Sequence, residues 1–269
     1  MNQSIRADPI LDRIHTLRLR RFRDRTRLHF VEGLRGVIRA IEAGIPIETL
    51  IYSEILCRHP GSQKHVRTAK RQGVRVLRVT PDQFRSISQT PRASGLGAVL
   101  RQHWTPLAEI DPRRGLCWLA LSHIRNPGNL GTILRTAEAV GAAGVIVMGH
   151  DCDPFDPDVV RPSMGGIFNL AFSRTTEAEF AAWSRRVGAR VIATSPRGET
   201  AYTEMPIEPP LVILLGEERK GLAEGELAAS THCVRIPIAG RADSLNVGVA
   251  AGVMLYEVMR RRESIERAD

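Results

Sequence analysis

Three polar loops that contain glycine follow apolar segments of this sequence, and their side chains could line a ligand site. The loops carry Asn129, then Glu218, then Ser244 and Asn246, and Arg135 lies nearly two turns into the helix expected after the first loop. Open parallel α/β sheets bind ligands at the carboxyl ends of their strands, so an arginine, a carboxylate, amides and a hydroxyl at such ends would border one crevice. Each loop taken alone is equally compatible with a structural role, because Arg135 could be a surface cation and the loop of Glu218 an ordinary turn.

The elements that must position these loops alternate between strand and helix in the second half of the chain. Apolar runs predict strands at 116–122, 145–148, near 169–172, 190–194, 211–215 and 234–238. Helices are predicted up to Val140, over 177–187 and from Ser244 onward. This alternation indicates an α/β domain built on a parallel sheet, with helices on both of its faces.

The first part of the chain predicts a smaller α/β sandwich of its own. A strongly basic helix is expected over 9–27, with six arginines between Arg18 and Arg27. Strands are expected at 28–31, 49–52, 74–79 and 96–101, and further helices at 33–43 and 65–72. A proline-containing stretch of mixed polarity follows. The predicted organisation is therefore a basic domain over 1–105, a linker over 106–114 and a second domain over 115–269.

The net charge of the 269-residue chain is unevenly distributed. The formal net charge is +9, but residues 1–110 contain 20 Lys and Arg against 9 Asp and Glu, whereas residues 111–269 contain 18 against 20. An isolated basic run is usually a solvated helix face. Here the run opens the domain that holds the whole charge excess, so contact with the phosphates of nucleic acid is the better interpretation.

Composition and motifs exclude several other classes of protein. Apolar residues make up 43% of the chain and charged residues 25%, which is globular composition. No segment approaches the ~20 apolar residues of a membrane span, and no secretory leader is recognisable, so cytoplasmic location is expected. The loop of four aspartates over 151–158 lacks the glycine and glutamate of a calcium-binding EF-hand, so helix capping and solvation are expected there. No metal site or disulfide is predicted, because the four cysteines form no C-x-x-C pair: Cys57, Cys117, Cys152 and Cys233.

Taken together, the three loops resemble the motifs of the SpoU (TrmH-type) RNA ribose 2′-O-methyltransferases. The first motif, N-x-G-x-x-x-R, corresponds to Asn129, Gly131 and Arg135; the second, G-x-E-x-x-G, to Gly216, Glu218 and Gly221; the third, I-P followed by S-L-N, to Ile236, Pro237, Ser244, Leu245 and Asn246. The basic first domain, with the sequence F-V-E-G at 30–33 after its arginine-rich segment, is similar to the ribosomal-protein-like substrate-binding domain of that family.

The resemblance implies a fold, a cofactor and partners. The fold would be a trefoil-knotted (SPOUT-type) parallel-sheet domain, with the knot formed by the second and third motif loops. S-adenosylmethionine would be held mainly by the backbone at Gly216, Ile236 and Leu245. The family is dimeric through the C-terminal domain, and the small residues over 248–252 are compatible with helix packing at such an interface. RNA would bind through the N-terminal domain, with ribosomal RNA of the 23S type favoured over transfer RNA.

The resemblance also implies catalytic roles. The family assigns Arg135 to activation of the ribose hydroxyl. Since the pKa of an arginine stays above ~12, we expect it to clamp the developing alkoxide and the adjacent phosphate and not to remove the proton itself. Asn129 and Ser244 would orient the ribose and the arginine, Glu218 would hold Arg135 or a neighbouring loop, and Asn246 would fix the third loop.

Two departures from the family pattern stand close to these motifs. Position 248 is glycine where relatives often have a small polar residue, and Arg125 and Asn126 replace the acidic residue that is common before the first motif. The second departure could alter contact with RNA.

Alternative functions remain open from the sequence. They are 2′-O-methylation of transfer RNA, and RNA binding without catalysis. A role in antibiotic resistance is compatible with the domain layout. A nicotinamide-dependent oxidoreductase would suit the α/β pattern, but no G-x-G-x-x-G follows a predicted strand.

Overall fold

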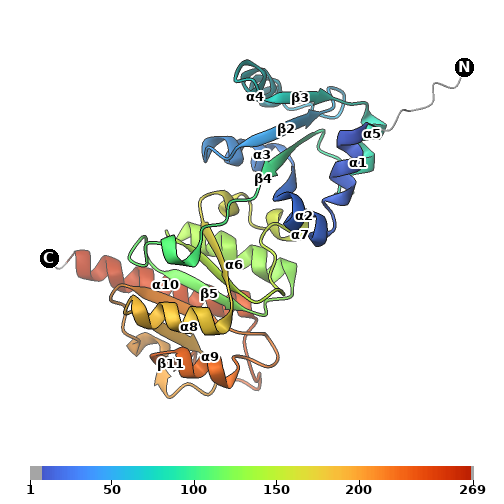
Figure 1. Ribbon diagram of the computed structural model, residues 1–269. Helices are drawn as coiled ribbons and strands as arrows, with labels where there is room; N and C mark the ends of the chain where they lie inside the picture. Colours follow the sequence, from blue (N-terminus) through green and yellow to red (C-terminus); the bar gives the residue numbers. More distant parts are fainter. Residues whose placement is uncertain (1–7, 268–269) are drawn as a thin grey trace, which may run out of the picture. The chain divides into compact units, whose positions relative to one another are not determined.

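The computed structural model describes residues 8–267 and divides the chain into two units (Figure 1). Unit 1 contains the residues up to 102 together with 155–168, and unit 2 contains 103–154 and the residues from 169 onward. The chain therefore passes between the units three times. No feature of the sequence indicated that 155–168 belongs with the N-terminal residues.

Unit 1 is a four-stranded sheet covered by helices. Its strand order is β1-β4-β2-β3, in which β4 is antiparallel to both of its neighbours and β2 is parallel to β3. Its core contains Ile14 from α1, Phe30 from β1 and Phe84 from α5. The elements are α1 (Pro9–Thr16), α2 (Arg20–Thr26), β1 (Leu28–Glu32), α3 (Leu34–Glu42), β2 (Ile47–Tyr52), α4 (Pro60–Arg71), β3 (Arg75–Arg78), α5 (Pro81–Ile87), β4 (Leu96–Arg101), α7 (Pro157–Val160) and η2 (Gly166–Phe168).

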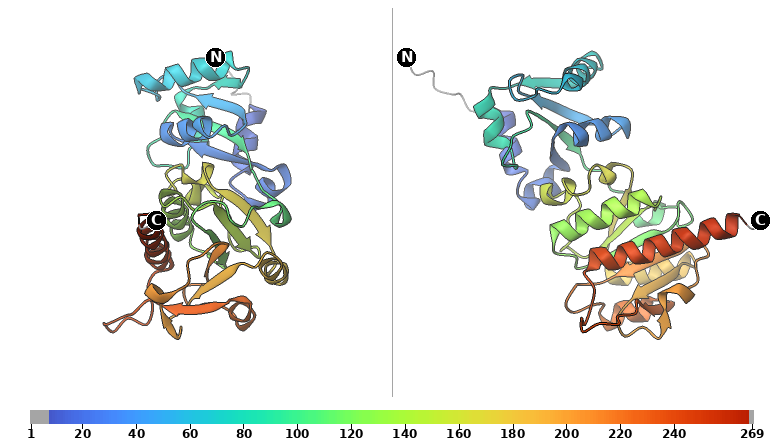
Figure 2. Two further views of the ribbon diagram at one scale, coloured as in Figure 1. Left: turned by 90° about the vertical axis from the view of Figure 1, so that its left-hand side faces the viewer. Right: turned by 180° about the vertical axis from the view of Figure 1, so that it is seen from behind.

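Unit 2 is built on a seven-stranded sheet of order β7-β6-β5-β10-β8-β11-β9, in which all neighbours are parallel. Figure 2 shows α6 and α10 side by side on one face, while α8 and α9 contact one another on the other face. The central strands β5, β6 and β10 are buried along their whole length, as both faces of a parallel sheet require. The elements are η1 (Leu107–Glu109), β5 (Trp118–Ser122), α6 (Pro127–Ala139), β6 (Gly144–Met148), β7 (Ala171–Thr175), α8 (Glu177–Arg186), β8 (Arg190–Thr194), β9 (Thr200–Ala201), η3 (Tyr202–Glu204), β10 (Leu211–Leu215), α9 (Glu224–Ala229), β11 (His232–Arg235) and α10 (Val247–Glu266). The predicted parallel α/β domain, preceded by a smaller α/β domain, is confirmed.

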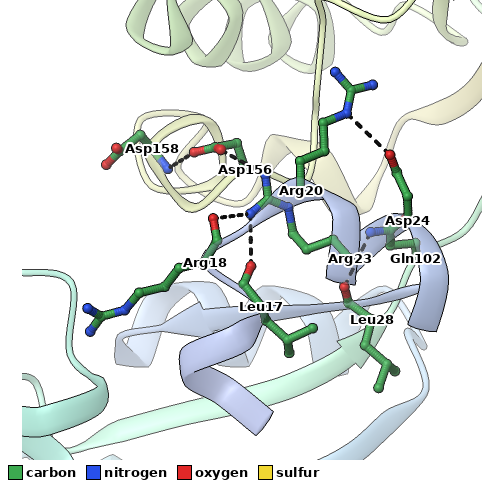
Figure 3. Close-up of polar contacts among 9 residues, drawn as sticks. All are labelled: Leu17, Arg18, Arg20, Arg23, Asp24, Leu28, Gln102, Asp156 and Asp158. Atoms are coloured by element: carbon green, nitrogen blue, oxygen red, sulfur yellow. Dashed lines mark hydrogen bonds and ion pairs between the residues drawn. The ribbon is translucent and has the colours of Figure 1, made fainter. Parts of the chain in front are cut away.

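The expected single helix over 9–27 is wrong, because the chain breaks between α1 and α2. Leu19 is extended, with φ −94° and ψ 125°, so the helix cannot continue through it. The carbonyls of Leu17 and Arg18, which the break leaves without helical partners, each accept a hydrogen bond of 2.8 Å from Nη1 of Arg23 (Figure 3). Arg23 is 1% exposed and is therefore a structural residue of unit 1, not a member of a solvated basic face.

Ser244 does not open the last helix, contrary to expectation. Asn246 is the N-cap of α10, and its Oδ1 accepts hydrogen bonds from the backbone N–H groups of Gly248 (2.9 Å) and Val249 (3.3 Å). The strand expected at 234–238 is instead His232–Arg235, and it ends before Pro237, which has no N–H for a sheet ladder. The strand expected near 169–172 is β7, two residues later.

Other features bear on the class of protein. No helix within residues 8–267 combines the length and the apolar character needed to cross a membrane. In the same part of the chain, no three His, Cys, Asp or Glu side chains are grouped so that they could hold a metal ion. All four cysteines are free thiols, and only Cys233 is partly exposed.

Candidate active site

The first two motif loops emerge beside each other from the middle of the sheet in unit 2. Strand β5 pairs with β10 along its length, and Leu121 lies opposite Leu215 at the carboxyl end. In the sheet, β6 and β7 lie on the side of β5 that faces away from β10. Strands β8 and β11 lie on the side of β10 that faces away from β5. The two loops therefore flank the point at which the strand order reverses, which is where α/β sheets form ligand crevices.

One side chain from each motif meets the others at this point. Nδ2 of Asn129 donates a hydrogen bond to Oε1 of Glu218. Nδ2 of Asn246 donates to Oδ1 of Asn129 at 3.0 Å and to the same Glu218 oxygen at 3.1 Å. A carboxylate that accepts two amide hydrogen bonds holds three loops, distant in sequence, in one arrangement.

Two of the asparagines near the site also begin helices. Oδ1 of Asn126 caps α6 by accepting from the backbone N–H groups of Gly128 (2.9 Å) and Asn129 (3.2 Å). An amide oxygen at an N-cap performs the same role as a carboxylate oxygen would. Asn246 caps α10 in the same way, which fixes the third loop at its junction with the helix.

A cavity of about 410 Å³ lies next to this cluster, between the loops that follow β8, β10 and β11. The three residues expected to hold a cofactor, Gly216, Ile236 and Leu245, all line it, together with Glu218 and Ser244. Its apolar lining is completed by Leu215, Leu222, Leu227, Ile238 and Val247. The cavity thus combines apolar walls with a few polar groups, as small-molecule sites do.

The two glycines of the second motif shape one wall of this cavity. A Cβ atom at Gly216 would lie 2.6 Å from the carbonyl group of Gly221, so no larger residue fits there. Glu217 and Gly221 exchange backbone hydrogen bonds of 3.1 and 2.9 Å, and Gly221 has a φ of +70°, which favours glycine. The spacing G-x-E-x-x-G therefore produces a tight loop with its backbone close to the cavity.

Arg135 stands apart from the amide cluster. It is exposed on α6 and does not line the cavity, and within residues 8–267 no hydrogen bond or ion pair involves its guanidinium. Glu218, which we expected to hold Arg135 or a neighbouring loop, contacts the loops of Asn129 and Asn246. The guanidinium is therefore available to a ligand.

Sequence reasoning missed a charged group at the end of β5. Nδ1 of His123 lies 2.6 Å from Oδ2 of Asp151, and Nη2 of Arg125 lies 3.2 Å from the same oxygen. The hydrogen bond with Asp151 raises the pKa of His123, and the hydrogen bond with His123 lowers the pKa of Asp151. His123 has a φ of +55° and borders, with Arg125 and Glu218, a small cavity of about 110 Å³. The run of aspartates was the only sequence signal for this group.

The small residues of α10 pack within the same chain. A Cβ atom at Gly248 would lie 3.5 Å from Thr132 of α6, and one at Gly252 would lie 4.0 Å from Thr136. These are ordinary van der Waals distances, and the tighter neighbour of a Cβ at 248 would be the capping Oδ1 of Asn246, at 3.1 Å. The outward face of α10 carries Val249, which is 53% exposed.

The parallel sheet and the convergence of the three motif loops define a candidate methyltransferase site. Residues 117–256 match the SpoU rRNA Methylase family. Residues 8–98 match the MRM3-like substrate binding domain. The chain belongs to the SpoU rRNA methylase family.

Similar proteins include enzymes that act on ribosomal RNA. The AdoMet-bound rRNA methyltransferase from Sinorhizobium meliloti is 36% identical and aligns over 95% of this chain and 96% of its own, with a TM-score of 0.87. The SpoU methyltransferase AviRb from Streptomyces viridochromogenes, solved in complex with AdoMet, is 29% identical over 96% of this chain and 99% of its own, with a TM-score of 0.85. A 23S rRNA (uridine(2479)-2′-O)-methyltransferase of S. viridochromogenes is 31% identical over 87% of this chain and 83% of its own length.

Proposed function

We propose that this protein transfers a methyl group from S-adenosylmethionine to a ribose 2′-hydroxyl of 23S-type ribosomal RNA. The observation that carries the proposal is the convergence of Asn129, Glu218 and Asn246, one from each motif, beside a cavity that Gly216, Ile236 and Leu245 line. The rRNA methyltransferases to which the chain is similar over nearly its whole length support the choice of substrate.

The cavity fits the cofactor in size and chemistry. Its volume of about 410 Å³ lies within the ~300–1,000 Å³ of typical ligand pockets. The backbone at Gly216, Ile236 and Leu245 would hold the molecule, with apolar side chains around it. S-adenosylmethionine supplies a methyl group bonded to a positively charged sulfur.

Arg135 would act on the ribose hydroxyl. The hydroxyl oxygen forms a bond to the methyl carbon as the carbon–sulfur bond breaks, and its proton leaves in the same step. An arginine remains protonated at neutral pH, so the guanidinium would stabilise the developing alkoxide and bind the adjacent phosphate, which could accept the proton. Asn129 and Ser244 would orient the ribose, while Glu218 and Asn246 hold the loops.

Several further properties belong to this proposal. The second and third motif loops would form the trefoil knot of the family. A second copy of the chain would pack on the C-terminal unit, and exposed apolar side chains on α10, Val249 and Tyr256, support that interface. The basic residues of the N-terminal domain would bind RNA, and the reaction would take place in the cytoplasm, where ribosomes are assembled.

Two experiments test the proposal. Isothermal calorimetry should detect S-adenosylmethionine binding by the purified protein, and its absence would favour a non-catalytic RNA-binding protein. Arg135→Lys should retain cofactor binding and lose about 100-fold in turnover, because lysine cannot bind alkoxide and phosphate in the same bidentate manner. Near-normal turnover of this variant would exclude the clamp.

The RNA substrate can be identified separately. Ribose methylation is mapped by mass spectrometry in ribosomal and transfer RNA from cells with and without the gene. A site that disappears from 23S rRNA on deletion and returns on complementation is the expected result. A site that disappears only from transfer RNA would replace the proposed substrate with the alternative one.

A further inference from the structure

Unit 1 contains a cavity that none of the three motifs reaches. We call it the β1–α3 cavity; its volume is about 300 Å³, and it is bounded by residues 30–36, 89–90 and 157–168. All three walls belong to unit 1. The end of β1 and the first turn of α3 form the first wall, the loop after α5 forms the second, and the segment around α7 and η2 forms the third.

The second wall is fixed by the carboxylate of Glu32. This carboxylate accepts hydrogen bonds from Oγ of Ser88 (2.9 and 3.0 Å) and from the backbone N–H groups of Gln89 (3.0 Å) and Ser94 (3.1 Å). The loop is therefore held in place before any ligand arrives. Oγ1 of Thr90 and Oγ of Ser94 also donate to it at 3.3 Å, so the oxygens of Glu32 are engaged by the loop, although the carboxylate keeps its charge.

The third wall is joined to the other two by close contacts. Nη1 of Arg161 donates to the carbonyl of Gln89 at 3.4 Å, and Nη2 pairs with Asp158 at 3.1 Å. A Cβ atom at Gly165 would lie 2.7 Å from Cγ of Arg39 on α3, and the φ of Gly165 is +93°, so only glycine allows this approach. The cavity is thus a built feature and not a gap between loose segments.

The lining of the cavity is apolar inside and cationic at the rim. Phe30, Val160 and Phe168 are all buried and form its interior. Arg35 and Arg161 line it as exposed side chains, and Met164 is 38% exposed beside Arg35, with its sulfur 3.9 Å from Nη1. A flat apolar group could pack against the buried side chains of the interior, and a negative charge attached to it could bind the arginines at the rim.

An unstacked nucleotide has this combination of properties. Proteins that recognise RNA place splayed-out bases against apolar and aromatic side chains or arginine planes, and bind the phosphates through cations. A fully stacked helix could not enter a cavity of this size, whereas a single base could. We propose that the β1–α3 cavity receives one unstacked base of the substrate RNA, with the adjoining phosphate on Arg35. This inference rests on the proposed function, since it requires that the chain bind RNA.

The test compares three variants of the full-length protein for binding to in vitro transcribed 23S rRNA over a range of salt concentrations. Leu34→Trp fills the cavity from its rim without changing the charge. It should weaken binding about tenfold and leave the salt dependence unchanged, because only contacts to the base are lost. Arg35→Ala should also weaken binding about tenfold and reduce the slope of log Kd against log salt by about 1, because one phosphate contact is lost.

Arg186→Ala is the matched control, since it removes the same charge from an exposed position of α8, outside the basic N-terminal domain and away from the cavity. It should change the Kd by less than about twofold. Calorimetry with S-adenosylmethionine alone checks that each variant is folded and retains the C-terminal site. If Leu34→Trp binds RNA like the wild type, the cavity does not receive a base. If Arg186→Ala loses as much affinity as Arg35→Ala, Arg35 does not bind the adjoining phosphate.

The failure of this inference can be told apart from failure of the proposed function. A wild-type protein that binds neither the cofactor nor the transcript contradicts the proposed function, and this inference with it. In a second outcome, the wild type and the Leu34→Trp variant bind and methylate the transcript equally well. This result contradicts only the role of the cavity.

Discussion

Arg23 and Asp156 form an ion pair of 2.8 Å within unit 1, although 133 residues separate them in the sequence (Figure 3). The guanidinium is almost completely buried and also binds the two carbonyls at the break between α1 and α2. Phe155 next to Asp156 packs against the ring of His29, with 4.9 Å between ring centroids. One arginine of the basic run therefore attaches residues 155–168 to the N-terminal part of the chain.

Arg23→Ala should destabilise the protein by about 3 kcal/mol, because it removes one member of a buried ion pair and leaves two carbonyls without a donor. Urea denaturation followed by circular dichroism measures the change. The control is Arg21→Ala, whose guanidinium is exposed over the ring of Phe22 and which should cost less than about 1 kcal/mol. Equal losses in both variants would contradict a special role for Arg23.

His29 should make the protein sensitive to mild acid. Burial, and then the positive charge of Arg23, lower the pKa of His29 to about 3 from its ordinary 6.5. Between these two pH values the unfolded chain binds a proton that the folded protein does not. The contribution of His29 to the free energy of unfolding is therefore greatest above about pH 6.5. It decreases by at most about 1.4 kcal/mol per pH unit as the pH is lowered toward 3.

The measurement is the free energy of unfolding between pH 4 and 8 for the wild type and for His29→Phe. The variant should show a weaker loss of stability with falling pH, since phenylalanine cannot bind a proton. Parallel pH profiles for the two proteins would show that other groups govern acid unfolding.

Asn246 combines two functions that substitutions can separate. Its oxygen caps α10 and its amide nitrogen binds Asn129 and Glu218. Asn246→Ser keeps a capping oxygen and removes the amide without adding charge, so the free energy of unfolding should change by less than about 1 kcal/mol while methyl transfer falls about tenfold. Asn246→Ala should lose about 1 kcal/mol of stability in addition to activity. A fully active Ser variant would show that the amide contacts do not matter for the reaction.

The pKa of His123 depends on Asp151, so Asp151→Asn should lower it toward the ordinary value of a histidine. The carboxylate stabilises the protonated ring, and this stabilisation is present below the unfolded pKa and is lost as the pH rises through the folded pKa. NMR titration of the imidazole protons reports the shift directly. Wild type and Asp151→Asn should therefore differ more in melting temperature at pH 6 than at pH 9, and the difference should be small because the pair is partly exposed.

Strands whose apolar residues are bounded by glycine, proline or polar turns were predictable from the sequence. The predicted bounds 96–101, 190–194 and 211–215 coincide with β4, β8 and β10. The basic helix over 9–27 was mispredicted because its break depends on a buried arginine, and local sequence does not reveal burial. The start of α10 was predicted too early because Ser244 and Asn246 are both good N-cap residues. The contacts of Asn246 with the two other loops favour Asn246 as the cap.

The candidate site was predictable as three loops but not as a geometry. Motif spacing pointed to Asn129, Glu218 and Asn246, while their mutual hydrogen bonds depend on strand order, which brings β5 next to β10. Asp151 pairs with His123, and Glu32 binds the loop after α5, across about 30 and about 60 residues of sequence. Periodic patterns describe neighbours within one helix or strand, so they do not predict such contacts. Glu218 was expected to hold Arg135 or a neighbouring loop, and its contacts are with Asn129 and Asn246 of the two other loops.

Residues 155–168 impose a condition on hybrid proteins. The stretch lies within the span that matches the methylase family, yet its packing partners are N-terminal. A chimera that joined the first 102 residues of this chain to the remainder of a relative would bring in a foreign stretch opposite Arg23 and the β1–α3 cavity. Exchange of the whole of unit 1 between family members therefore requires two grafts, one for the N-terminal residues and one for residues 155–168.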